Sequence, residues 1–409
     1  MRHLRDPKLL AMLIVALCTV ALVAPPTPVA DETIEGVQVA ALDQPRVYME
    51  VYRTANGQPL KTKGDEATSA IEAFLDTGAS GMVLSSDTAG KLGVKEAKTP
   101  DGKSISFEDT GVAGSEKFGV TEPLFAALAP YPNGEQPGAF AKPAGPLRMQ
   151  IRPEAGILAM IAPGMDIAGM PVMAGKVVVI DPSPLAKFDK LKTIVLSAGD
   201  RNIPKTSRHV PLTYDSFAAY TRTTPREATG PNLGANPMIG PDPFKPDPSK
   251  KGVVITYKGK SVSGTFLLDT GAVTSIISTK LARELGVKLD DNDKPVGIPK
   301  DQQFSLAVGG LGGAKQSSGI FFDRLELPTR EGRSIVYEKA PLLITDISVA
   351  DAKGNTFTLD GVLGMNYLVA SAEITGGLLP DVGKMVDGPY KLIVIDNQRG
   401  ELGLEPRTP

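Results

Sequence analysis

Residues 75–95 read LDTGASGMVLSSDTAGKLGVK, and residues 268–288 read LDTGAVTSIISTKLARELGVK. The two segments align without gaps at an offset of 193 residues and are identical at 11 of 21 positions. In each, an apolar run follows the shared LDTGA, and a Ser- or Thr-capped short helix is expected to end near Gly93 or Gly286. Self-similarity at a fixed offset predicts that one structural unit occurs twice in the chain.

The similarity between the two copies extends in both directions. Upstream, the alternating run VYMEVYRTANG (47–57) resembles VVITYKGK (253–260), and each contains a turn signal. Downstream, KVVVID (176–181) resembles KLIVID (391–396). Short runs with a period of two residues, separated by Gly and Pro, are typical of β-strands. We therefore expect a mainly β fold.

A stretch without periodicity separates the two copies. Between Thr224 and Gly252 the chain carries seven prolines, which indicates an exposed linker or insertion; a proline-rich ligand for another module is the alternative. The segment HVPLTY (209–214) is a candidate first strand of the second copy. The domains expected are a first lobe at 31–207, an inter-lobe segment at 208–252 and a second lobe at 253–409.

The N-terminus has the pattern of an export signal. Arg2, Arg5 and Lys8 precede the apolar run LLAMLIVALCTVALVA (9–24), and small residues follow it. This order predicts a signal peptide at residues 1–30 and a periplasmic or secreted protein. The alternative is an uncleaved anchor, although a run of this length falls short of the ~20 residues that span a bilayer comfortably.

Composition narrows the chemistry. Of 409 residues 42% are hydrophobic and 22% are charged, with a net charge of -2, which suits a globular protein and gives no reason to expect a nucleic-acid partner. Cys18 is the single cysteine, and His3 and His209 are the two histidines. Disulfide frameworks and Cys/His zinc sites are therefore excluded, and a His-dependent triad would rest on His209. We expect no metal and no cofactor.

The remaining candidates for chemistry are two aspartates. Asp76 and Asp269 each end an apolar strand and begin Asp-Thr-Gly-Ala. Gly78 and Gly271 permit a tight turn with a close backbone approach. A carboxylate between apolar strands is costly unless it is hydrogen-bonded or functional. The alternative is an aspartate that only caps a turn, kept in both copies.

The paired motifs resemble those of the aspartic peptidases, and more closely the retroviral-type (retropepsin-like) branch than pepsin, because Ala follows the motif in both copies. The resemblance covers roughly residues 35–200 and 208–405. It implies two homologous closed β-barrel-like (acid protease) lobes with Asp76 and Asp269 facing each other across a cleft. It also implies that Thr77 and Thr270 cross-bond beneath them.

Further family features are implied with less regular matches. An apolar-apolar-Gly segment that packs near each catalytic loop corresponds to Val362-Leu363-Gly364 in the second copy and to Ala162-Pro163-Gly164 in the first. Flap hairpins are expected around Asp101–Gly119 and Val308–Ser318. The flap tyrosine of pepsins has no counterpart between Asp76 and Tyr131.

The expected function is an aspartic endopeptidase acting on a peptide or protein. Two adjacent carboxyls cannot both ionise, so they share a proton and activate a water. Both halves lie in one chain, so a monomer suffices. The alternatives are a catalytically silent peptide-binding or structural module of the cell envelope, and a site formed with a neighbouring chain's repeat.

Overall fold

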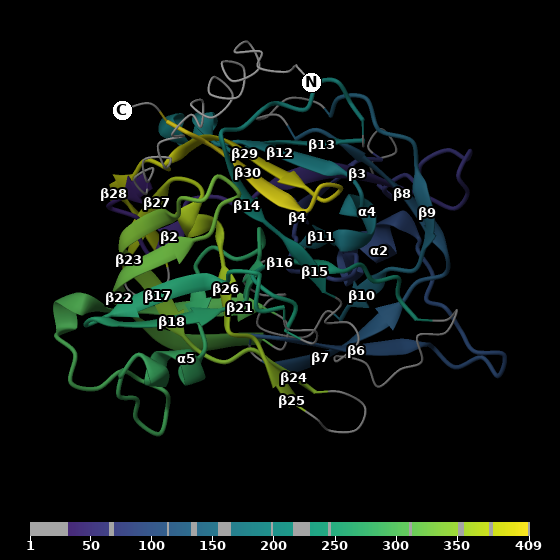
Figure 1. The fold of residues 1–409 in the computed structure, drawn as a ribbon. Helices are drawn as coiled ribbons and strands as arrows, with labels where there is room; N and C mark the ends of the chain where they lie inside the picture. The colour runs from purple at the N-terminus through teal and green to yellow at the C-terminus, as the bar shows by residue number, and fades with distance from the viewer. Residues whose placement is uncertain are drawn as a thin grey trace, which may run out of the picture.

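The computed structural model describes residues 32–64, 69–112, 114–131, 137–153, 165–197, 199–215, 230–243, 247–310, 313–350, 356–375 and 379–407. The fold is mainly β and consists of two lobes of curled sheets joined by a shared sheet (Figure 1). The predicted signal peptide lies outside the described residues. Within those residues, no helix has the length and apolar character needed to cross a membrane.

The first lobe is built on one large sheet, with strand order β6-β7-β10-β5-β11-β4-β3-β8-β9. Its strands are β3 (Arg46–Tyr52), β4 (Ile71–Leu75), β5 (Val83–Ser85), β6 (Ser106–Gly111), β7 (Gly114–Val120), β8 (Leu124–Ala129), β9 (Ala144–Leu147), β10 (Gln150–Arg152) and β11 (Asp166–Ala168). Helix α2 (Ser86–Leu92) follows β5, and α4 (Met170–Met173) follows β11.

The second lobe's sheet runs in the order β15-β16-β19-β26-β20-β23-β22-β17-β18, with β21 beside β22. Its strands are β15 (Thr213–Asp215), β16 (Asn236–Ile239), β17 (Val253–Tyr257), β18 (Lys260–Gly264), β19 (Phe266–Leu268), β20 (Ile276–Ile277), β21 (Gln303–Gly310), β22 (Gly313–Leu327), β23 (Ile335–Ile344) and β26 (Gly361–Leu363). The helices are α5 (Thr279–Glu284) and the 3-10 turns η4 (Lys300–Gln302) and η5 (Met365–Tyr367). A small hairpin of β24 (Ser348–Ala350) and β25 (Thr356–Thr358) projects from this lobe.

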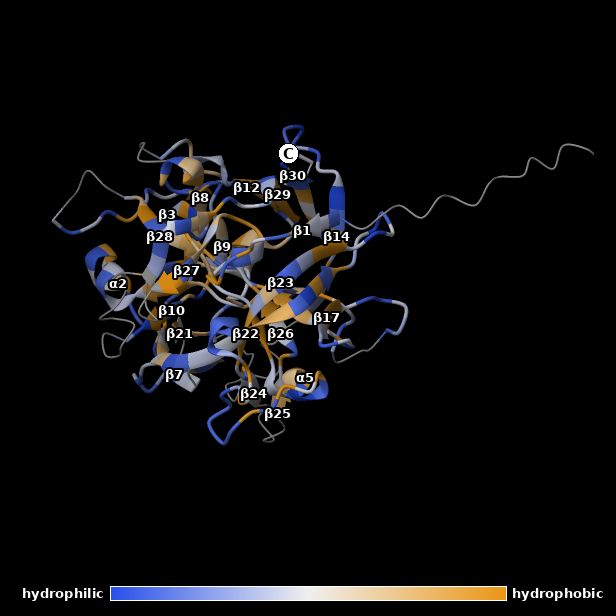
Figure 2. Ribbon diagram, turned by 90° about the vertical axis from the view of Figure 1, so that its left-hand side faces the viewer, coloured by the Kyte–Doolittle hydropathy of each residue, from blue (hydrophilic) through white to orange (hydrophobic). Residues whose placement is uncertain are grey.

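The two lobes repeat the same pairing around their motifs. In the first, β4 pairs in parallel with β11, which pairs antiparallel with β5, and β5 pairs in parallel with β10. In the second, β19, β26, β20 and β23 pair in the same senses. The turns after β4 and β19 therefore occupy equivalent places. Helices α2 and α5 carry both polar and apolar residues in Figure 2, as expected for helices that cover a core with one face.

A shared sheet holds the lobes together. It has the order β13-β12-β29-β30-β14 and consists of β12 (Val177–Asp181), β13 (Lys192–Leu196), β14 (Arg208–Pro211), β29 (Tyr390–Asp396) and β30 (Glu401–Pro406). The matching segments KVVVID and KLIVID thus lie side by side, because β12 and β29 pair antiparallel from Val177 opposite Asp396 to Ile180 opposite Ile393. A 3-10 turn, η2 (Ser183–Lys187), leads from β12 toward β13.

Two expectations about the lobe boundaries were wrong. Residues 32–41 were expected in the first lobe, but β1 (Glu32–Ile34) pairs in parallel with β23, and β2 (Ala40–Ala41) pairs with β27 (Ser371–Thr375). Strand β27 in turn pairs with β28 (Leu379–Val386). Within the segment expected to be an exposed linker, Asn236–Ile239 is a buried strand, because the apolar side chains of Met238 and Ile239 complete the second lobe's core.

One buried carboxyl outside the motifs ties the first lobe together. Asp166 in β11 is 3% exposed. Its Oδ1 accepts the Ser85 N–H at 2.7 Å and its Oδ2 accepts the Thr88 hydroxyl at 2.6 Å, which fixes β11 to the start of α2. Burial raises the pKa of Asp166 to about 6, against the lowering effect of the hydrogen bonds from Thr88 and Ser85 and of the charge on Arg152.

Asp166 is therefore expected to make the fold less stable as the pH rises. Its folded-state pKa lies above that of an unfolded carboxyl, so its favourable contribution is complete below about pH 4 and disappears as the pH passes about 6. The loss amounts to about 3 kcal/mol at most. Urea unfolding at pH 4 and pH 7 measures how far the free energy of unfolding falls between the two pH values. Asp166→Asn should reduce this fall, whereas Asp291→Asn, on the surface, should leave it unchanged. An Asp166→Asn profile as steep as that of the wild type would contradict this assignment.

Candidate active site

The two Asp-Thr-Gly turns meet at the junction of the lobes. Asp76 follows β4 and Asp269 follows β19, and each backbone extends the parallel pairing of its strand: Asp76 N donates to Ala168 O at 3.1 Å and Asp269 N donates to Leu363 O at 3.0 Å. Leu75, which precedes Asp76, is fully buried. A strand anchored in the core thus presents each carboxyl at its end.

The threonines of the two turns cross-bond, as the resemblance implied. Thr77 N donates to Thr270 Oγ1 at 3.0 Å, and Thr270 N donates to Thr77 Oγ1 at 3.1 Å. Each hydroxyl also donates to the opposite strand, Thr77 Oγ1 to Leu268 O at 2.6 Å and Thr270 Oγ1 to Leu75 O at 2.5 Å. Both threonines are fully buried. These four bonds fix the distance between the two turns.

The glycines of the motifs are required by the close approach of the opposite carboxyl. A Cβ on Gly78 would lie 2.5 Å from Asp269 Cγ, and a Cβ on Gly271 would lie 2.4 Å from Asp76 Cγ. No larger residue fits either position without displacing a carboxyl. Each aspartate is thus packed on the other lobe's turn, and the two carboxyls lie close enough to influence each other's pKa. Both residues keep part of their surface accessible to solvent.

The electrostatic surroundings of the two carboxyls differ. Asp76 Oδ1 accepts the N–H groups of Gly78 at 2.8 Å and Ala79 at 3.0 Å, and Asp269 Oδ1 accepts the Gly271 N–H at 2.8 Å. Burial raises the pKa of Asp76, although the hydrogen bonds from Asp269 and from backbone N–H groups oppose the increase. Burial and then the charge of Asp76 raise the pKa of Asp269 well above its usual value. The pair is therefore arranged to share one proton between the two carboxyls.

The apolar-apolar-Gly segment was placed correctly in the second lobe only. Met365 N donates to Ala272 O at 2.8 Å, and a Cβ on Gly364 would lie 2.5 Å from Thr274 O, so Val362-Leu363-Gly364 packs on the turn after Asp269. In the first lobe Met170 N donates to Ala79 O at 3.0 Å.

The first-lobe segment is Ile167-Ala168-Gly169 rather than Ala162-Pro163-Gly164. A Cβ on Gly169 would lie 1.9 Å from Gly81 O, so this glycine is the one packed against the turn. Residues 162–164 lie outside the described part of the chain. The sequence did carry the signal, since IAGM (167–170) aligns with VLGM (362–365) if the offset increases by two residues.

Two amides that sequence reasoning missed support the turns from the opposite lobe. Gln44, which precedes β3, donates from Nε2 to Gly271 O. Asn236 in β16 donates from Nδ2 to Thr77 O at 2.9 Å and Gly78 O at 3.0 Å, and its Oδ1 accepts the Ser80 hydroxyl at 2.6 Å. No motif marks either residue, because each acts through a segment that crosses from the other lobe.

Asn236→Ala is expected to lower the free energy of unfolding by about 2 kcal/mol, because the variant leaves buried carbonyls without donors. Asn232→Ala is the matched control. It lies in the same segment but is exposed, and its Oδ1 accepts the Arg148 N–H at 2.6 Å, so its loss should cost under about 1 kcal/mol. Denaturant unfolding of both variants measures the difference. Equal losses would show that Asn236 does not support the turn.

The two predicted hairpins are present and their tips meet. Strands β6 and β7 form the first, β21 and β22 the second, and a Cβ on Gly310 would lie 2.8 Å from Val112 Cγ1 of the opposite tip. Val112 and Val308 belong to the same apolar cluster as Ala272 and Val273, which follow Asp269. Both hairpins therefore pack against the apolar cluster that also contains the residues after Asp269. Gln150 Nε2 donates to Asp109 Oδ2 at 3.0 Å and holds the first hairpin.

His209 lies apart from the aspartates, in the shared sheet. Its Nδ1 is 2.7 Å from Glu331 Oε1 and its Nε2 is 3.2 Å from Thr206 Oγ1. This order of acid, histidine and hydroxyl resembles a hydrolytic triad, but Thr206 Oγ1 packs on strand β30, since a Cβ on Gly403 would lie 2.4 Å from it. A hydroxyl covered in this way is poorly placed to attack a substrate. Among the described residues, no group of three or more His, Cys, Asp or Glu side chains is arranged to hold a metal ion.

Comparison with known proteins supports an aspartyl peptidase-like fold. The family model for aspartyl proteases matches residues 253–367, which include the second Asp-Thr-Gly turn and the segment Val362-Leu363-Gly364. The chain is also similar to the crystal structure of basic 7S globulin from soybean, with 10% sequence identity over 89% of this chain and 95% of that chain and a TM-score of 0.38. A likeness at that level says nothing about activity. No curated protein matches the chain.

Proposed function

We propose that this chain, with its aspartyl peptidase-like fold, is an aspartic endopeptidase that hydrolyses peptide bonds with a water activated between Asp76 and Asp269. The observation that carries the proposal is the close pair of carboxyls, each packed on the opposite turn, with the two turns held together by the reciprocal bonds of Thr77 and Thr270. A turn-capping role would require neither the contact between the carboxyls nor their remaining exposure.

The proposed reaction needs one proton on the pair. The Gly78 and Ala79 N–H groups stabilise Asp76 as a carboxylate. Asp76 takes a proton from the water while the oxygen of the water bonds to the carbonyl carbon of the peptide. Asp269 gives its proton to the carbonyl oxygen, and a neutral tetrahedral diol forms. The proton on Asp76 then moves to the amide nitrogen as the carbon–nitrogen bond breaks. The proton of one hydroxyl returns to Asp269, which restores the starting state.

The surroundings suit an extended peptide. The paired hairpins would close over a chain lying across Asp76 and Asp269, and would reduce the access of bulk water during the reaction. Extended peptides bind largely through their backbone groups, so many sequences would be accepted at the centre of the site.

The proposal extends to the oligomeric state, the partner and the location of the protein. Both lobes, as duplicated units, lie in one polypeptide, so a monomer would contain a complete site. The partner would be a peptide or protein. Residues 1–30 would be removed as a signal peptide on export to the periplasm or medium.

The proposal is tested with a denatured, unstructured polypeptide incubated with the purified chain between pH 3 and pH 7. Mass spectrometry of the products should show cleavage at internal bonds, and the Asp76→Asn variant should yield none above background. If the wild type and the variant cleave equally, or neither cleaves, the catalytically silent peptide-binding module becomes the better account.

A further inference from the structure

Within the described residues, the second lobe contains a hairpin that has no counterpart at the corresponding place in the first lobe. From Gly169 to Lys176 in the first lobe the chain advances seven residues, whereas from Gly364 to Lys391 in the second it advances 27. The additional residues form β27 and β28, and β27 pairs with β2 near the N-terminus. The hairpin is therefore a feature of the second lobe alone at this place in the repeat, and its surroundings are the place to look for a role specific to that lobe.

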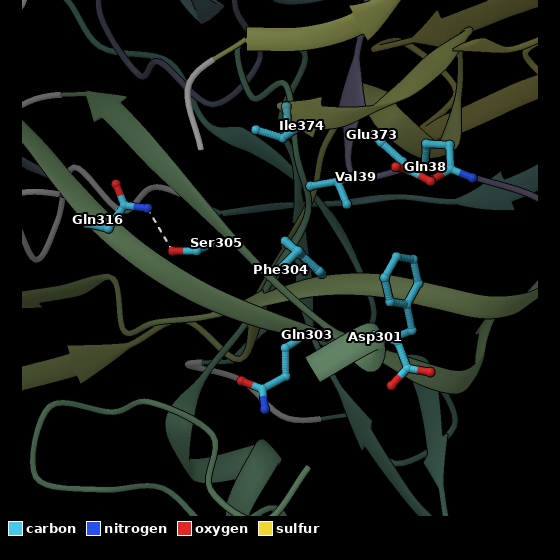
Figure 3. Close-up of a pocket in the computed structure, with 10 residues that line it drawn as sticks. Gln38, Val39, Asp301, Gln303, Phe304, Ser305, Gln316, Glu373 and Ile374 are labelled. Atoms are coloured by element: carbon cyan, nitrogen blue, oxygen red, sulfur yellow. Dashed lines mark hydrogen bonds between the residues drawn. The ribbon is translucent and has the colours of Figure 1, made fainter. Parts of the chain in front are cut away.

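This hairpin forms one side of a pocket of about 640 Å³. Glu373 and Ile374 of β27 line it together with Gln38 and Val39 from the segment before β2, and residues of η4, β21 and β22 form the opposite side. In Figure 3 Gln38 and Glu373 lie toward the top of the view and Asp301 and Gln303 toward the bottom, with Val39 and Phe304 between them.

The pocket lies close to the second catalytic turn. Phe304 and Ile374 pack in the same apolar cluster as Ala272 and Val273, which follow Asp269. Ala41, two residues after Val39, donates its N–H to Val273 O at 2.8 Å. The pocket is therefore connected to the second turn by apolar packing and by this backbone hydrogen bond.

The polar side chains of the lining offer both donors and acceptors, and two carboxylates are among the acceptors. Each glutamine donates from its own amide to the protein: Gln38 to Gly36 O at 3.3 Å, Gln303 to Ile298 O at 2.6 Å and Gln316 to Ser305 Oγ at 2.7 Å. Ser305 Oγ donates to Ser317 O at 3.1 Å. Each glutamine keeps its amide oxygen as an acceptor and a second amide N–H as a donor, and the two carboxylates add further acceptors.

The lining of the pocket is acidic and partly apolar. The lining contains Asp301 and Glu373 but no Lys or Arg. Glu373 has an ion pair with Lys384 at 2.6 Å, in which both side chains are about half exposed, so a second cation can share the carboxylate. Val39, Ile374 and the edge-on ring pair Phe304 and Phe321, with centroids 5.6 Å apart, supply apolar contact. An aliphatic stem ending in a multiple hydrogen-bond donor matches such a lining.

We propose that this pocket binds a lysine or arginine side chain of the peptide substrate, and so selects substrates with a basic residue at one fixed position away from the scissile bond. The inference rests on the proposed function. The stem would lie along the apolar residues, and the charged end would meet Asp301, Glu373 and the glutamine oxygens.

The test uses one host peptide in which a single lysine, or norleucine as its uncharged analogue, is moved position by position. At one position kcat/KM of the wild type should be about fivefold to tenfold higher for lysine than for norleucine. Asp301→Asn combined with Glu373→Gln should bring that ratio close to one. Lys384→Met, which frees Glu373, should raise it. Asp291→Asn combined with Glu284→Gln removes two exposed charges elsewhere in the same lobe and should leave the ratio unchanged.

The outcomes separate this inference from the proposed function. The pocket assignment is wrong if the peptide is cleaved with a lysine-to-norleucine ratio of kcat/KM near one at every position. It is also wrong if the Asp301→Asn, Glu373→Gln double variant (the pocket variant) keeps the preference for lysine. Neither result contradicts the peptidase proposal. If the wild type cleaves no peptide, the peptidase proposal fails. Binding of the same peptides, labelled and measured by fluorescence anisotropy, then tests the pocket assignment alone. Tighter binding of a lysine peptide that the pocket variant loses supports it, and equal binding of lysine and norleucine peptides overturns it.

Discussion

Asp269→Asn is expected to lower kcat on an unstructured peptide by about 10³-fold or more, because the variant cannot supply the proton that the developing tetrahedral oxygen requires. Asp76→Asn should cause a loss of similar size, because an amide cannot take a proton from the water. The change in shape is minimal in both variants, so KM should change little. Initial rates of peptide hydrolysis over a range of pH values measure both effects.

The same two variants should make the fold more stable at neutral pH. Both folded-state pKa values are raised, chiefly by burial, so the contribution of the dyad to stability is complete at acidic pH and is lost as the pH rises. An amide does not titrate and avoids this loss. Asp269→Asn should therefore have a higher Tm than the wild type at pH 7, and the difference should shrink toward pH 3.

A loss of activity accompanied by a gain in stability distinguishes a catalytic carboxyl from a structural one. If Asp269→Asn lowered the Tm at pH 7, the carboxylate would be a net contributor to the stability of the fold, and the turn-capping explanation would account for its presence.

The rate of peptide hydrolysis by the wild type should rise and then fall with pH, because the pair of carboxyls must hold one proton and neither two nor none.

The sequence predicted the parts of this site that are local. An apolar strand that leads into Asp-Thr-Gly needs only neighbouring residues to be recognised, and the structure brings Asp76 and Asp269 together as expected. The short helices are local too: Ser85 and Ser278 cap α2 and α5 through their side chains. The hairpins β6–β7 and β21–β22 also follow from local turn residues.

The parts that could not be predicted depend on contacts between segments distant in the sequence. Glu32–Ile34 adds to β23 of the second lobe because that strand offers it a free edge, which no pattern within residues 32–41 reveals. Asn236 lies in a proline-rich region typical of a linker, yet β16 is buried between β15 and β19. The first-lobe segment at 167–169 was missed because Ala162-Pro163-Gly164, which is also followed by Met, offers a competing match to Val362-Leu363-Gly364.

Thr77→Val is expected to lower the free energy of unfolding by about 2–5 kcal/mol, one of the larger effects available in this chain. Valine keeps the shape of threonine, but it leaves the Thr270 N–H without its acceptor and Leu268 O without its donor, and both positions are fully buried. Thr77→Ser is the control. It keeps the hydroxyl and loses one methyl group, so its cost should be about 1 kcal/mol. Urea unfolding at one pH compares the two.

Combining Thr77→Val with Thr270→Val tests whether the four cross-bonds act as one unit. The two hydroxyls do not bond to each other, and each substitution removes a different pair of bonds. Independent bonds would give additive losses. If either pair is needed to keep the turns at hydrogen-bond distance, the second substitution removes bonds that are already weakened. The double variant should then lose less than the sum, with a coupling of about 1 kcal/mol. Additive losses would instead mean that the turns are positioned by the sheets on which they lie, and that the threonines only add to a geometry already fixed.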